Sequence, residues 1–480
     1  MRRTKIIATL GPATDKPGVL EKLVLSGVDL FRLNYSHDKK SSHKNRIHQI
    51  REITKRLGVE TGIIADLQGP KIRLRNFREG KIILNENDLF ILDTALATNA
   101  GTKSHIGVTY KNLAKDVKKG NLLLIDDGRI ELVVEKVSGG KIHCKTVVGG
   151  TLSNSKGINL PGGGLSAKAL TEKDKSDLIH AVNLGVDYIA VSFVRTANDI
   201  RSTRAQLKKL KSKTQIIAKF ERTEAIENAE EIINAADAIM IARGDMGVEI
   251  GDAALPPVQK RLINLAGEMD TAVITATQMM ESMIGNQTPL RAEVFDVANA
   301  VLDGTDAVML SGETSIGRYP VKVVQTMAKI CEETEKQRAI RTSDHRINNR
   351  FEKVDEAIAM ATMYAANHIG AKAIAALTET GATCLWMSRI SSGIPIFAFT
   401  RNLSTMRRVK LYRGIYPVLF DVTTTDTTEV NHEIIDDLLQ QNHLSEGDLV
   451  IITKGDLKGF RGGTNTMKII KVGGPTGKFN

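Results

Sequence analysis

The sequence predicts an α/β fold: a (β/α)8 TIM barrel with an inserted small β-barrel lid domain and a C-terminal α/β domain. Three observations lead to this prediction. Eight short apolar runs each end in polar residues and precede a segment with helical periodicity. A long insertion separates the third run from the fourth, and a further alternation of strand and helix patterns follows the last run.

The eight runs are almost continuously apolar, as strands of a parallel sheet buried on both faces should be. They are TKIIATLGPAT, DLFRLNYSH, TGIIADLQ, DYIAVSFVR, QIIAKFE, DAIMIARGD, TAVITATQ and DAVMLSGET. Eight such units predict a closed barrel over residues 1–68 and 164–342. The active site of such a barrel lies at the C-terminal ends of its strands, so the residues that finish each run are the candidates for function.

Residues 69–163 alternate apolar and polar positions between Gly and Asn/Asp turns, which is typical of a small all-β domain. Gly69-Pro70 precedes this segment and Pro161–Gly164 follows it, and both junctions suit a lid that swings over the barrel. A static β insertion is the alternative. We expect the barrel to resume at Thr171, whose side chain caps a helix while Asp174 reaches back to it.

Residues 343–480 again alternate helical and strand patterns, which predicts a separate α/β domain. Within it, LTETGATC follows an apolar strand and precedes a helical stretch. The backbone and hydroxyl groups there suit a phosphate at a helix N-terminus, and an ordinary strand-to-helix turn is the alternative. The candidate residues are Thr378, Thr380, Gly381 and Thr383.

The composition argues against a membrane protein, a secreted protein and a protein held by disulfides or zinc. The 42% apolar and 25% charged residues are typical of a soluble globular chain, and no stretch has the roughly 18 apolar residues of a membrane span. The start has no signal-peptide pattern, so we expect a cytoplasmic protein. The three cysteines lie far apart and outside any CxxC pattern, which argues against a disulfide framework and a zinc site.

The net charge of +11 is compatible with nucleic acid or with a small anionic substrate. Aromatic residues are only 4% of the chain, too few for single-strand stacking platforms. The basic segment 201–213 falls where a barrel helix is expected, so we interpret it as a solvated face. We expect neither a nucleic acid nor a membrane as partner.

Glu221 ends the fifth run and Asp245 follows the sixth, so the two carboxylates come from neighbouring strands. Two carboxylates completed by substrate and water oxygens are a usual Mg²⁺ environment. Lys219 precedes Glu221 by two residues and therefore shares its strand face. A salt-bridged layer of the barrel is the alternative interpretation.

Other strand ends carry hydroxyls, amides and cations, which suit a small carboxylated phosphate. His37 alone fits a structural role equally well. The residues are Arg32, Asn34, Ser36 and His37 after the second run, Arg243 to Gly247 after the sixth, Thr277 after the seventh, and Ser311 and Glu313 after the eighth.

Several of these segments together resemble the pyruvate kinases of bacteria, and the resemblance extends from near the N-terminus to the last strand. The segments are FRLNYSH, AKFERTEA, IMIARGDMGVEI and ITATQMMESM, in that order. The resemblance implies transfer of the phosphoryl group of phosphoenolpyruvate to ADP, giving pyruvate and ATP in the final step of glycolysis. It also implies a homotetramer.

The resemblance assigns roles to individual residues. It places the phosphoenolpyruvate carboxylate on Gly244, Asp245 and Thr277, Mg²⁺ on Glu221 and Asp245, and the phosphoryl group near Arg32 and Lys219. Lys219, Arg32 and Thr277 are thus the catalytic candidates, and Thr277 and Ser311 are placed to organise a water relay to the enolpyruvate. A second Mg²⁺ accompanies ADP. The nucleotide-binding positions are Asn34, Ser36, His37, Arg73 and Lys156.

The segment DLQGPKIR resembles the potassium-independent branch of the family, in which lysine replaces a glutamate. Other members hold K⁺ at positions matching Asn34, Ser36, Asp66 and the Leu67 carbonyl. The ammonium group of Lys71 supplies the positive charge instead, so we expect Mg²⁺-dependent activity without K⁺. The resemblance also puts an effector at the Thr378–Thr383 loop. Ala382 replaces a larger polar residue there, and Lys458 and Arg461 favour a sugar monophosphate or AMP.

Two other functions remain open at this stage. A Mg²⁺-dependent lyase or aldolase acting through a pyruvate enolate also needs two carboxylates and an arginine, but it has no use for the lid or for Lys219. A basic RNA-binding scaffold needs a contiguous basic patch and does not need Glu221 or Asp245. Replacing either carboxylate with alanine distinguishes the enzymes from the scaffold.

Overall fold

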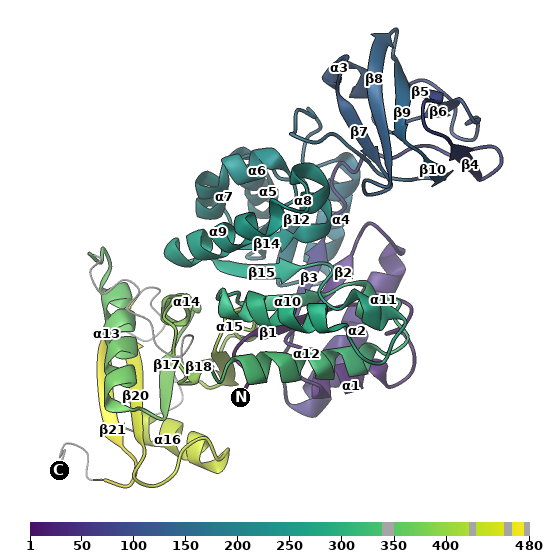
Figure 1. Ribbon diagram of the computed structural model, residues 1–480. Helices are drawn as coiled ribbons and strands as arrows, with labels where there is room; N and C mark the ends of the chain where they lie inside the picture. Colours follow the sequence, from purple (N-terminus) through teal and green to yellow (C-terminus); the bar gives the residue numbers. More distant parts are fainter. Residues whose placement is uncertain (338–349, 422–428, 456–462, 475–480) are drawn as a thin grey trace. The chain divides into compact units, whose positions relative to one another are not determined.

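The computed structural model describes residues 1–337, 350–421, 429–455 and 463–474 (Figure 1). The chain divides into two compact units. The first comprises Met1–Ala65, Asn183–Tyr188 and Ile263–Asn480, and the second comprises Asp66–Val182 and Ile189–Leu262. Among the described residues, no helix is long and apolar enough to cross a membrane.

The eight predicted runs form one closed barrel, in the order β1-β16-β15-β14-β13-β12-β3-β2. Its strands are parallel where β1 meets β2 and β16, and where β13 meets β14. Nearly every strand residue is buried, which explains why the runs lack an apolar-polar alternation. The strands are β1 (Lys5–Thr9), β2 (Leu30–Asn34), β3 (Gly62–Asp66), β12 (Tyr188–Val191), β13 (Gln215–Phe220), β14 (Ala238–Ala242), β15 (Ala272–Ala276) and β16 (Ala307–Leu310).

In the first unit, amphipathic helices follow the barrel strands. In α2 and α12 the buried residues recur every three or four positions, and α12 begins with Pro320, whose fixed φ suits the first helical turn. The elements are α1 (Val19–Leu25), α2 (Lys40–Leu57), η1 (Glu281–Ile284), α10 (Arg291–Leu302), α11 (Gly312–Ser315) and α12 (Pro320–Thr334).

The first unit also contains a five-stranded sheet in the order β19-β18-β17-β20-β21, formed by the C-terminal part of the chain. Its strands pair in parallel except for β21, which runs antiparallel to β20. Helix α16 packs its buried Ile434 and Leu438 into the core of this sheet. The elements are β17 (Ala373–Leu377), β18 (Ile396–Thr400), β19 (Ile415–Leu419), β20 (Leu449–Gly455), β21 (Thr464–Lys471), α13 (Val354–Ile369), α14 (Ala382–Arg389), α15 (Leu403–Val409) and α16 (Val430–Gln440).

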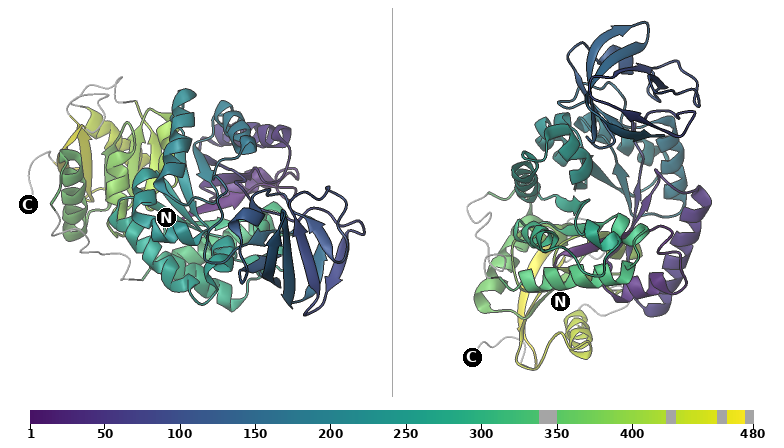
Figure 2. Two further views of the ribbon diagram at one scale, coloured as in Figure 1. Left: turned by 90° about the horizontal axis from the view of Figure 1, so that it is seen from above. Right: turned by 45° about the vertical axis from the view of Figure 1, so that its right-hand side comes forward.

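In the second unit, the inserted segment forms a six-stranded sheet, β11-β7-β8-β9-β5-β6, and a two-stranded sheet, β10-β4. These strands gather into one all-β body in both views of Figure 2, around a continuous apolar core. They are β4 (Lys81–Leu84), β5 (Leu89–Asp93), β6 (His105–Gly107), β7 (Leu122–Ile125), β8 (Ile130–Ser138), β9 (Lys141–Val148), β10 (Gly150–Ser153) and β11 (Ile158–Asn159), with the short helix α3 (Leu113–Asp116).

After the insertion, helix α4 (Glu172–Asn183) begins with the expected reciprocal cap. The Asp174 carboxylate accepts from Thr171 N at 2.9 Å, and Thr171 Oγ1 accepts from Asp174 N at 3.1 Å. The remaining helices are α5 (Ala197–Lys209), α6 (Thr223–Glu227), α7 (Ala229–Ala235), α8 (Arg243–Ile250) and α9 (Leu255–Glu268). Segment 201–213 lies largely on α5, whose basic side chains are mostly exposed, as expected of a solvated barrel helix.

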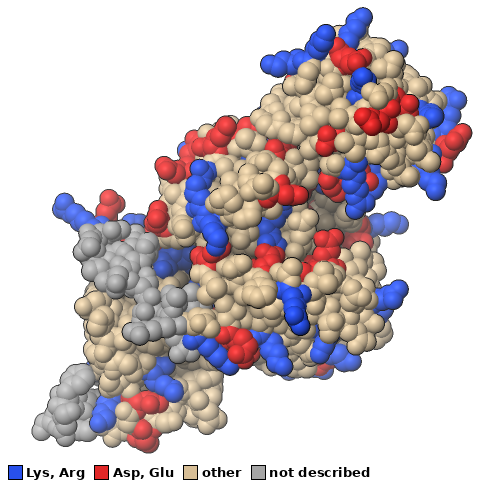
Figure 3. All heavy atoms as spheres, viewed as in Figure 1, with Lys and Arg blue, Asp and Glu red and all other residues tan. Residues whose placement is uncertain are grey.

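Positive and negative side chains alternate over the face shown in Figure 3, and no large basic area dominates it. On that face the basic side chains are interspersed with acidic ones and do not gather in one patch. This distribution gives no support there to the scaffold interpretation, which needs a contiguous basic surface.

Candidate active site

A buried lysine lies at the centre of a polar cluster in the second unit. Lys219, near the end of β13, is only 8% exposed. Its Nζ lies 2.8 Å from Glu221 Oε1 and 3.2 Å from Asp66 Oδ1. It also donates a hydrogen bond of 2.8 Å to Ser192 Oγ. Two carboxylates thus compensate one buried cation, and the period of two that put Lys219 and Glu221 on one face agrees with this contact.

Both carboxylate oxygens of Glu221 have partners. Oε2 accepts a hydrogen bond of 2.6 Å from the backbone N–H of Phe193, a residue held at a φ of 55°. Burial raises the pKa of Glu221, Lys219 lowers it, and the nearby negative charge of Asp245 raises it again. The two carboxylates are therefore close enough to interact electrostatically, and a divalent cation would relieve their repulsion.

This donor set fits Mg²⁺. Its members are hard oxygen ligands, which Mg²⁺ prefers, and Mg²⁺ is commonly held by one or two carboxylates with water and substrate phosphate oxygens. Within the described residues there is no cluster of three or more His, Cys, Asp or Glu side chains placed to hold a metal. A cation on Glu221 and Asp245 would thus need further ligands from substrate and water.

Asp245 lies in the first turn of helix α8, where a negative side chain interacts favourably with the helix dipole. The sequence led us to expect a Gly-rich turn at Arg243–Gly247, but the helix starts directly after β14. Gly244 and Asp245 therefore lie at a helix N-terminus. Lys71 Nζ lies 3.1 Å from Asp245 Oδ1, a contact that the sequence did not predict.

Ser192 is a functional candidate that sequence reasoning missed. Its hydroxyl donates a hydrogen bond of 2.7 Å to the Leu67 carbonyl and accepts one from Lys219. It therefore links the end of β3 to β13. The signal was available, because Ser192 directly follows β12 and is the first polar residue after the apolar part of the fourth run.

Arg73 and Lys156 lie side by side in the inserted β region. Leu74 N donates to Lys156 O at 2.8 Å, and Arg73 Nη1 donates to Ser155 O at 3.0 Å. The ammonium group of Lys156 pairs with Asp126 at 2.7 Å. Two of the five predicted nucleotide-binding residues are therefore brought together in the second unit.

The other three, Asn34, Ser36 and His37, form one turn at the end of β2 in the first unit. Asn34 Oδ1 accepts from Ser36 N at 3.0 Å, and Asn34 O accepts from His37 N at 3.2 Å. On the same strand, Arg32 is 9% exposed and donates to Thr9 Oγ1 at 3.1 Å. The guanidinium is thus held near the ends of β1 and β2.

Thr277 follows β15 with a φ of 65°. Positive φ is an outlier for a β-branched residue, and it costs about 1–3 kcal/mol where the surrounding structure enforces it. Such strain concentrates at functional sites. Its hydroxyl donates to the Ala276 carbonyl at 2.6 Å.

Ser311 and Glu313 follow β16. Ser311 N donates to Glu313 Oε2 at 2.6 Å, and burial raises the pKa of that carboxyl group. The Ser311 hydroxyl is buried and has no hydrogen-bond partner in the described part of the chain.

The predicted effector loop connects β17 to α14. Thr378 Oγ1 accepts from Gly381 N at 2.8 Å, and Gly381 has a φ of 84° at the start of the helix. Thr380 Oγ1 accepts from Ala382 N at 3.4 Å. The Thr383 hydroxyl lies 2.9 Å from Thr464 Oγ1. Lys458 and Arg461 lie outside the described residues.

Comparison with known proteins covers both parts of the chain. Residues 1–324 match the family model described as pyruvate kinase, barrel domain, and residues 356–470 match pyruvate kinase, alpha/beta domain. The chain is 53% identical over 476 residues to a pyruvate kinase of Buchnera aphidicola subsp. Acyrthosiphon pisum, covering 98% of this chain and 99% of that relative.

Other relatives are similar over nearly their whole length. A pyruvate kinase II of Salmonella typhimurium is 51% identical over 476 residues, covering 98% of this chain and 99% of the relative. A pyruvate kinase of Haemophilus influenzae is 50% identical over 460 residues, covering 95% and 96%.

Proposed function

This chain belongs to the pyruvate kinase family, and from that premise we propose that it transfers the phosphoryl group of phosphoenolpyruvate to ADP, giving pyruvate and ATP. The enzyme is a phosphotransferase. The observation that carries the proposal is the buried Lys219, held between Asp66 and Glu221 and linked to the end of β3 through Ser192.

The chain's own residues bind and orient the substrate. The amides of Gly244 and Asp245 and the hydroxyl of Thr277 bind the carboxylate of phosphoenolpyruvate. Arg32 and Lys219 stabilise the charge on the transferring phosphoryl group, because a loose transition state needs positioning and compensating charge more than covalent help. Contacts that hold Lys219 before substrate binds limit the reorganisation that catalysis requires.

Glu221 and Asp245 are the proposed Mg²⁺ ligands. A Mg²⁺ ion held there would supply positive charge that compensates the negative oxygens of the substrate. The N–H of Phe193 and the ammonium group of Lys219 orient Glu221 before the metal binds. A second Mg²⁺ enters with ADP in this proposal.

Asn34, Ser36, His37, Arg73 and Lys156 are the proposed nucleotide-binding residues. The last two belong to the inserted segment 69–163, which we propose as a lid that closes over ADP and excludes water. Gly69 has a φ of 66°, a conformation that favours glycine, and it precedes Pro70. The two residues therefore define the backbone conformation at the point where the proposed lid begins.

Asn34, Ser36, Asp66, Leu67 and Lys71 are proposed to form the region where other family members hold K⁺. Lys71 supplies a fixed positive charge there, so the enzyme works with Mg²⁺ and without K⁺. The contact of Lys71 with Asp245 supports this role, because it puts the ammonium group beside a proposed Mg²⁺ ligand.

The loop that contains Thr378, Thr380, Gly381 and Thr383 is the proposed effector site. A sugar monophosphate or AMP would bind at the N-terminus of α14, a helix of eight residues. Gly381→Ala would test this site, because an added Cβ would lie 2.6 Å from Val409 Cγ1. It should abolish activation by either ligand without removing basal turnover. We further propose a cytoplasmic homotetramer, on family likeness.

The first experiment measures pyruvate release from phosphoenolpyruvate and ADP with Mg²⁺, without K⁺ or Na⁺. Robust turnover that K⁺ does not change supports both the reaction and the role of Lys71. Turnover that appears only with K⁺ retains the reaction and overturns the role of Lys71. Absence of turnover under every condition, with aldol cleavage of a pyruvate-containing substrate instead, would favour the lyase.

A further inference from the structure

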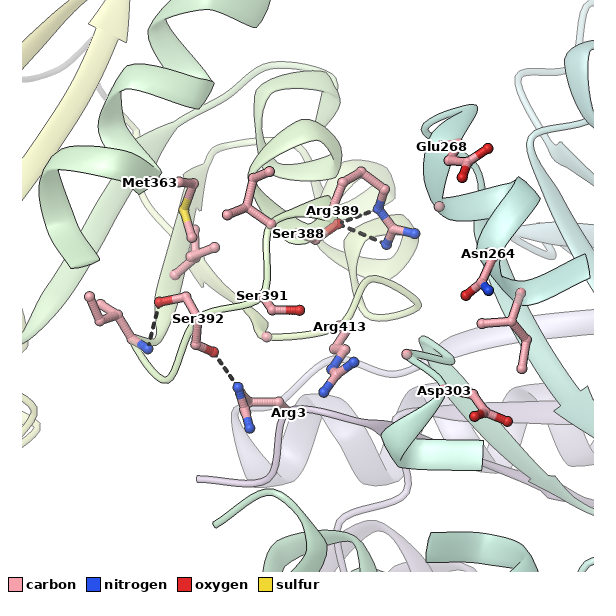
Figure 4. Close-up of a pocket in the computed structure, with 17 residues that line it drawn as sticks. Arg3, Asn264, Glu268, Asp303, Met363, Ser388, Arg389, Ser391, Ser392 and Arg413 are labelled. Carbon is pink, nitrogen blue, oxygen red and sulfur yellow. Dashed lines mark hydrogen bonds between the residues drawn. The ribbon is translucent and has the colours of Figure 1, made fainter. Parts of the chain in front are cut away.

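A cavity of about 240 Å³ lies in the first unit, and none of the residues assigned above lines it. Figure 4 shows that it has two walls. One wall carries Ser388, Arg389, Ser391, Ser392 and Arg413 from the C-terminal part of the chain, together with Arg3. The facing wall carries Asn264, Glu268 and Asp303.

Two of the three arginines are already neutralised by carboxylates. Arg389 makes a bidentate contact with Asp306, and the two side chains are 4% and 0% exposed. Arg3 lies 3.8 Å from a carboxylate oxygen of Glu335 and donates to the Glu335 carbonyl at 2.9 Å. It also donates to the Ser392 carbonyl.

Arg413 differs from both. The residue is 91% buried, yet its Nη2 has no hydrogen-bond partner among the described residues. The backbone N–H of Arg413 donates to Asp306 at 3.0 Å, which fixes the turn that carries Arg413 just before β19. A buried guanidinium nitrogen without an acceptor is unfavourable, because it has lost water and gained no hydrogen bond.

Arg413 is buried close to two other arginines and to two carboxylates. Burial lowers its pKa to about 10; the positive charges of Arg3 and Arg389 add to the effect, and the carboxylates of Glu335 and Asp306 oppose it. A negatively charged ligand would offset the lost hydration by accepting a hydrogen bond from Nη2 of Arg413. Arginine also suits carboxylate and phosphate groups, because its planar donors match their oxygens.

We propose that this cavity binds a small metabolite with one phosphate or carboxylate group, held by Nη2 of Arg413, and with hydroxyl groups directed to the facing wall. The hydroxyls of Ser388 and Ser391 line the anionic end, and Asn264, Glu268 and Asp303 offer acceptors for the ligand's hydroxyls. At about 240 Å³ the cavity lies just below the roughly 300–1,000 Å³ of most small-molecule sites, which favours a small ligand. The site is separate from the proposed reaction and does not depend on it.

The cavity can be blocked without touching Arg413. Gly267 lines it near the end of α9, and a Cβ added there would meet nothing within 4 Å. Gly267→Leu should therefore fill the cavity while improving the helix propensity of the position. Arg413→Gln removes the guanidinium and keeps a hydrogen-bond donor. Gly285→Leu is the matched control, since its Cβ also meets nothing within 4 Å and Gly285 does not line this cavity.

Calorimetric titration of the full chain with inorganic phosphate and with glycerol 3-phosphate tests the proposal. Glycerol 3-phosphate should bind more tightly than phosphate, because only it reaches the facing wall. Arg413→Gln should weaken binding at this site about tenfold or more, since hydrogen bonds to charged groups contribute about 1.5–3 kcal/mol. Gly267→Leu should abolish binding at this site, whereas Gly285→Leu should retain it.

If Arg413→Gln does not fold, the comparison of ligand binding by Gly267→Leu and by Gly285→Leu still tests the proposal. Unchanged binding in Gly267→Leu would overturn the location. Equal affinities for the two probes would overturn the role of the facing wall. Anion binding that survives both variants at wild-type affinity would assign it to another site and overturn the proposal.

Discussion

The ammonium nitrogen of Lys71 lies 3.1 Å from Oδ1 of Asp245, although the two residues are 174 positions apart in the sequence. Each side chain is about one quarter exposed, at 26% and 25%. A cation at this position helps to compensate Asp245, which also raises the pKa of the neighbouring Glu221. Lys71 is therefore part of the charge balance around the proposed metal ligands.

Lys71→Glu should make turnover depend on K⁺. In buffer without K⁺ we expect the rate to fall about tenfold or more, because the loss of one charged hydrogen bond costs about 1.5–3 kcal/mol and a new carboxylate faces Asp245. Added K⁺ should restore much of the rate. The measurement is pyruvate release against K⁺ concentration at constant ionic strength.

Lys81→Gln is the control, because this exposed lysine on β4 loses a charge in the same unit without touching Asp245. It should leave the rate and its independence of K⁺ unchanged. A Lys71→Glu enzyme that remains indifferent to K⁺ would contradict the proposed role.

Glu221→Gln should remove Mg²⁺-dependent turnover and leave the fold intact. The new amide oxygen can still accept from Phe193 N, and Lys219 keeps Asp66 as its partner. What disappears is a negative oxygen ligand, so we expect turnover to fall by about 10²–10³ or more. The half-saturating Mg²⁺ concentration should rise in parallel.

The control is Glu227→Gln, an exposed position at the end of α6. Circular dichroism of both variants should match the wild type. A Glu221→Gln enzyme with an unchanged Mg²⁺ requirement and unchanged turnover would remove this residue from the metal site.

The barrel could be predicted because parallel strands buried on both faces must be apolar. The composition of each run therefore indicates by itself that the strand is buried. The cap at Thr171 could be predicted for a similar reason, since both partners lie within four residues. Lys219 and Glu221 share a strand face, so their contact also follows from local periodicity.

Contacts between distant segments could not be predicted in this way. The Lys71–Asp245 pair depends on how the fold places the segment after β3 and helix α8, and no local sequence pattern predicts it. Ser192 was missed because a serine after an apolar run also occurs at ordinary strand ends. Arg413 became a candidate only when its burial and its missing acceptor were known.

Gly69→Ala should destabilise the entrance to the inserted segment. Gly69 has a φ of 66°, and an added Cβ would lie 2.9 Å from both Phe193 Cδ2 and Ser192 Cβ. We expect a cost of about 1 kcal/mol from the backbone conformation and about 1–3 kcal/mol more from the overlap. Displacement of Ser192 should also lower turnover, because this residue holds Lys219.

Gly80→Ala separates the two contributions, since Gly80 has a φ of 79° and its Cβ would meet nothing within 4 Å. It should show only the backbone cost and normal turnover. Urea unfolding midpoints and pyruvate release measure the two effects. Equal losses in both variants would show that the overlap with Ser192 and Phe193 has no consequence.

Glu249, on α8, should make the stability of the protein fall as the pH rises through the weakly acidic range. Glu249 is 7% exposed, and burial raises its pKa from 4.5 to about 7. The positive charge of Arg222 lowers this pKa in part, and the negative charge of Glu224 raises it. Between these two pH values the folded protein keeps a proton that the unfolded chain has lost. The contribution of Glu249 to the free energy of unfolding is therefore most favourable below about pH 4.5, and it declines as the pH rises to about 7.

This rise in the pKa of Glu249 corresponds to about 3 kcal/mol at most. Glu249→Gln removes the ionisation, so the variant should gain stability relative to the wild type as the pH rises from about 4.5 to 7, with a constant difference above that range. Urea unfolding midpoints of the two proteins across this range measure the effect, because subtraction cancels the titration of all other groups. Glu230→Gln on the exposed face of α7 should show no such dependence. A difference between Glu249→Gln and the wild type that stays flat with pH would mean that Glu249 ionises alike in the folded and unfolded chains.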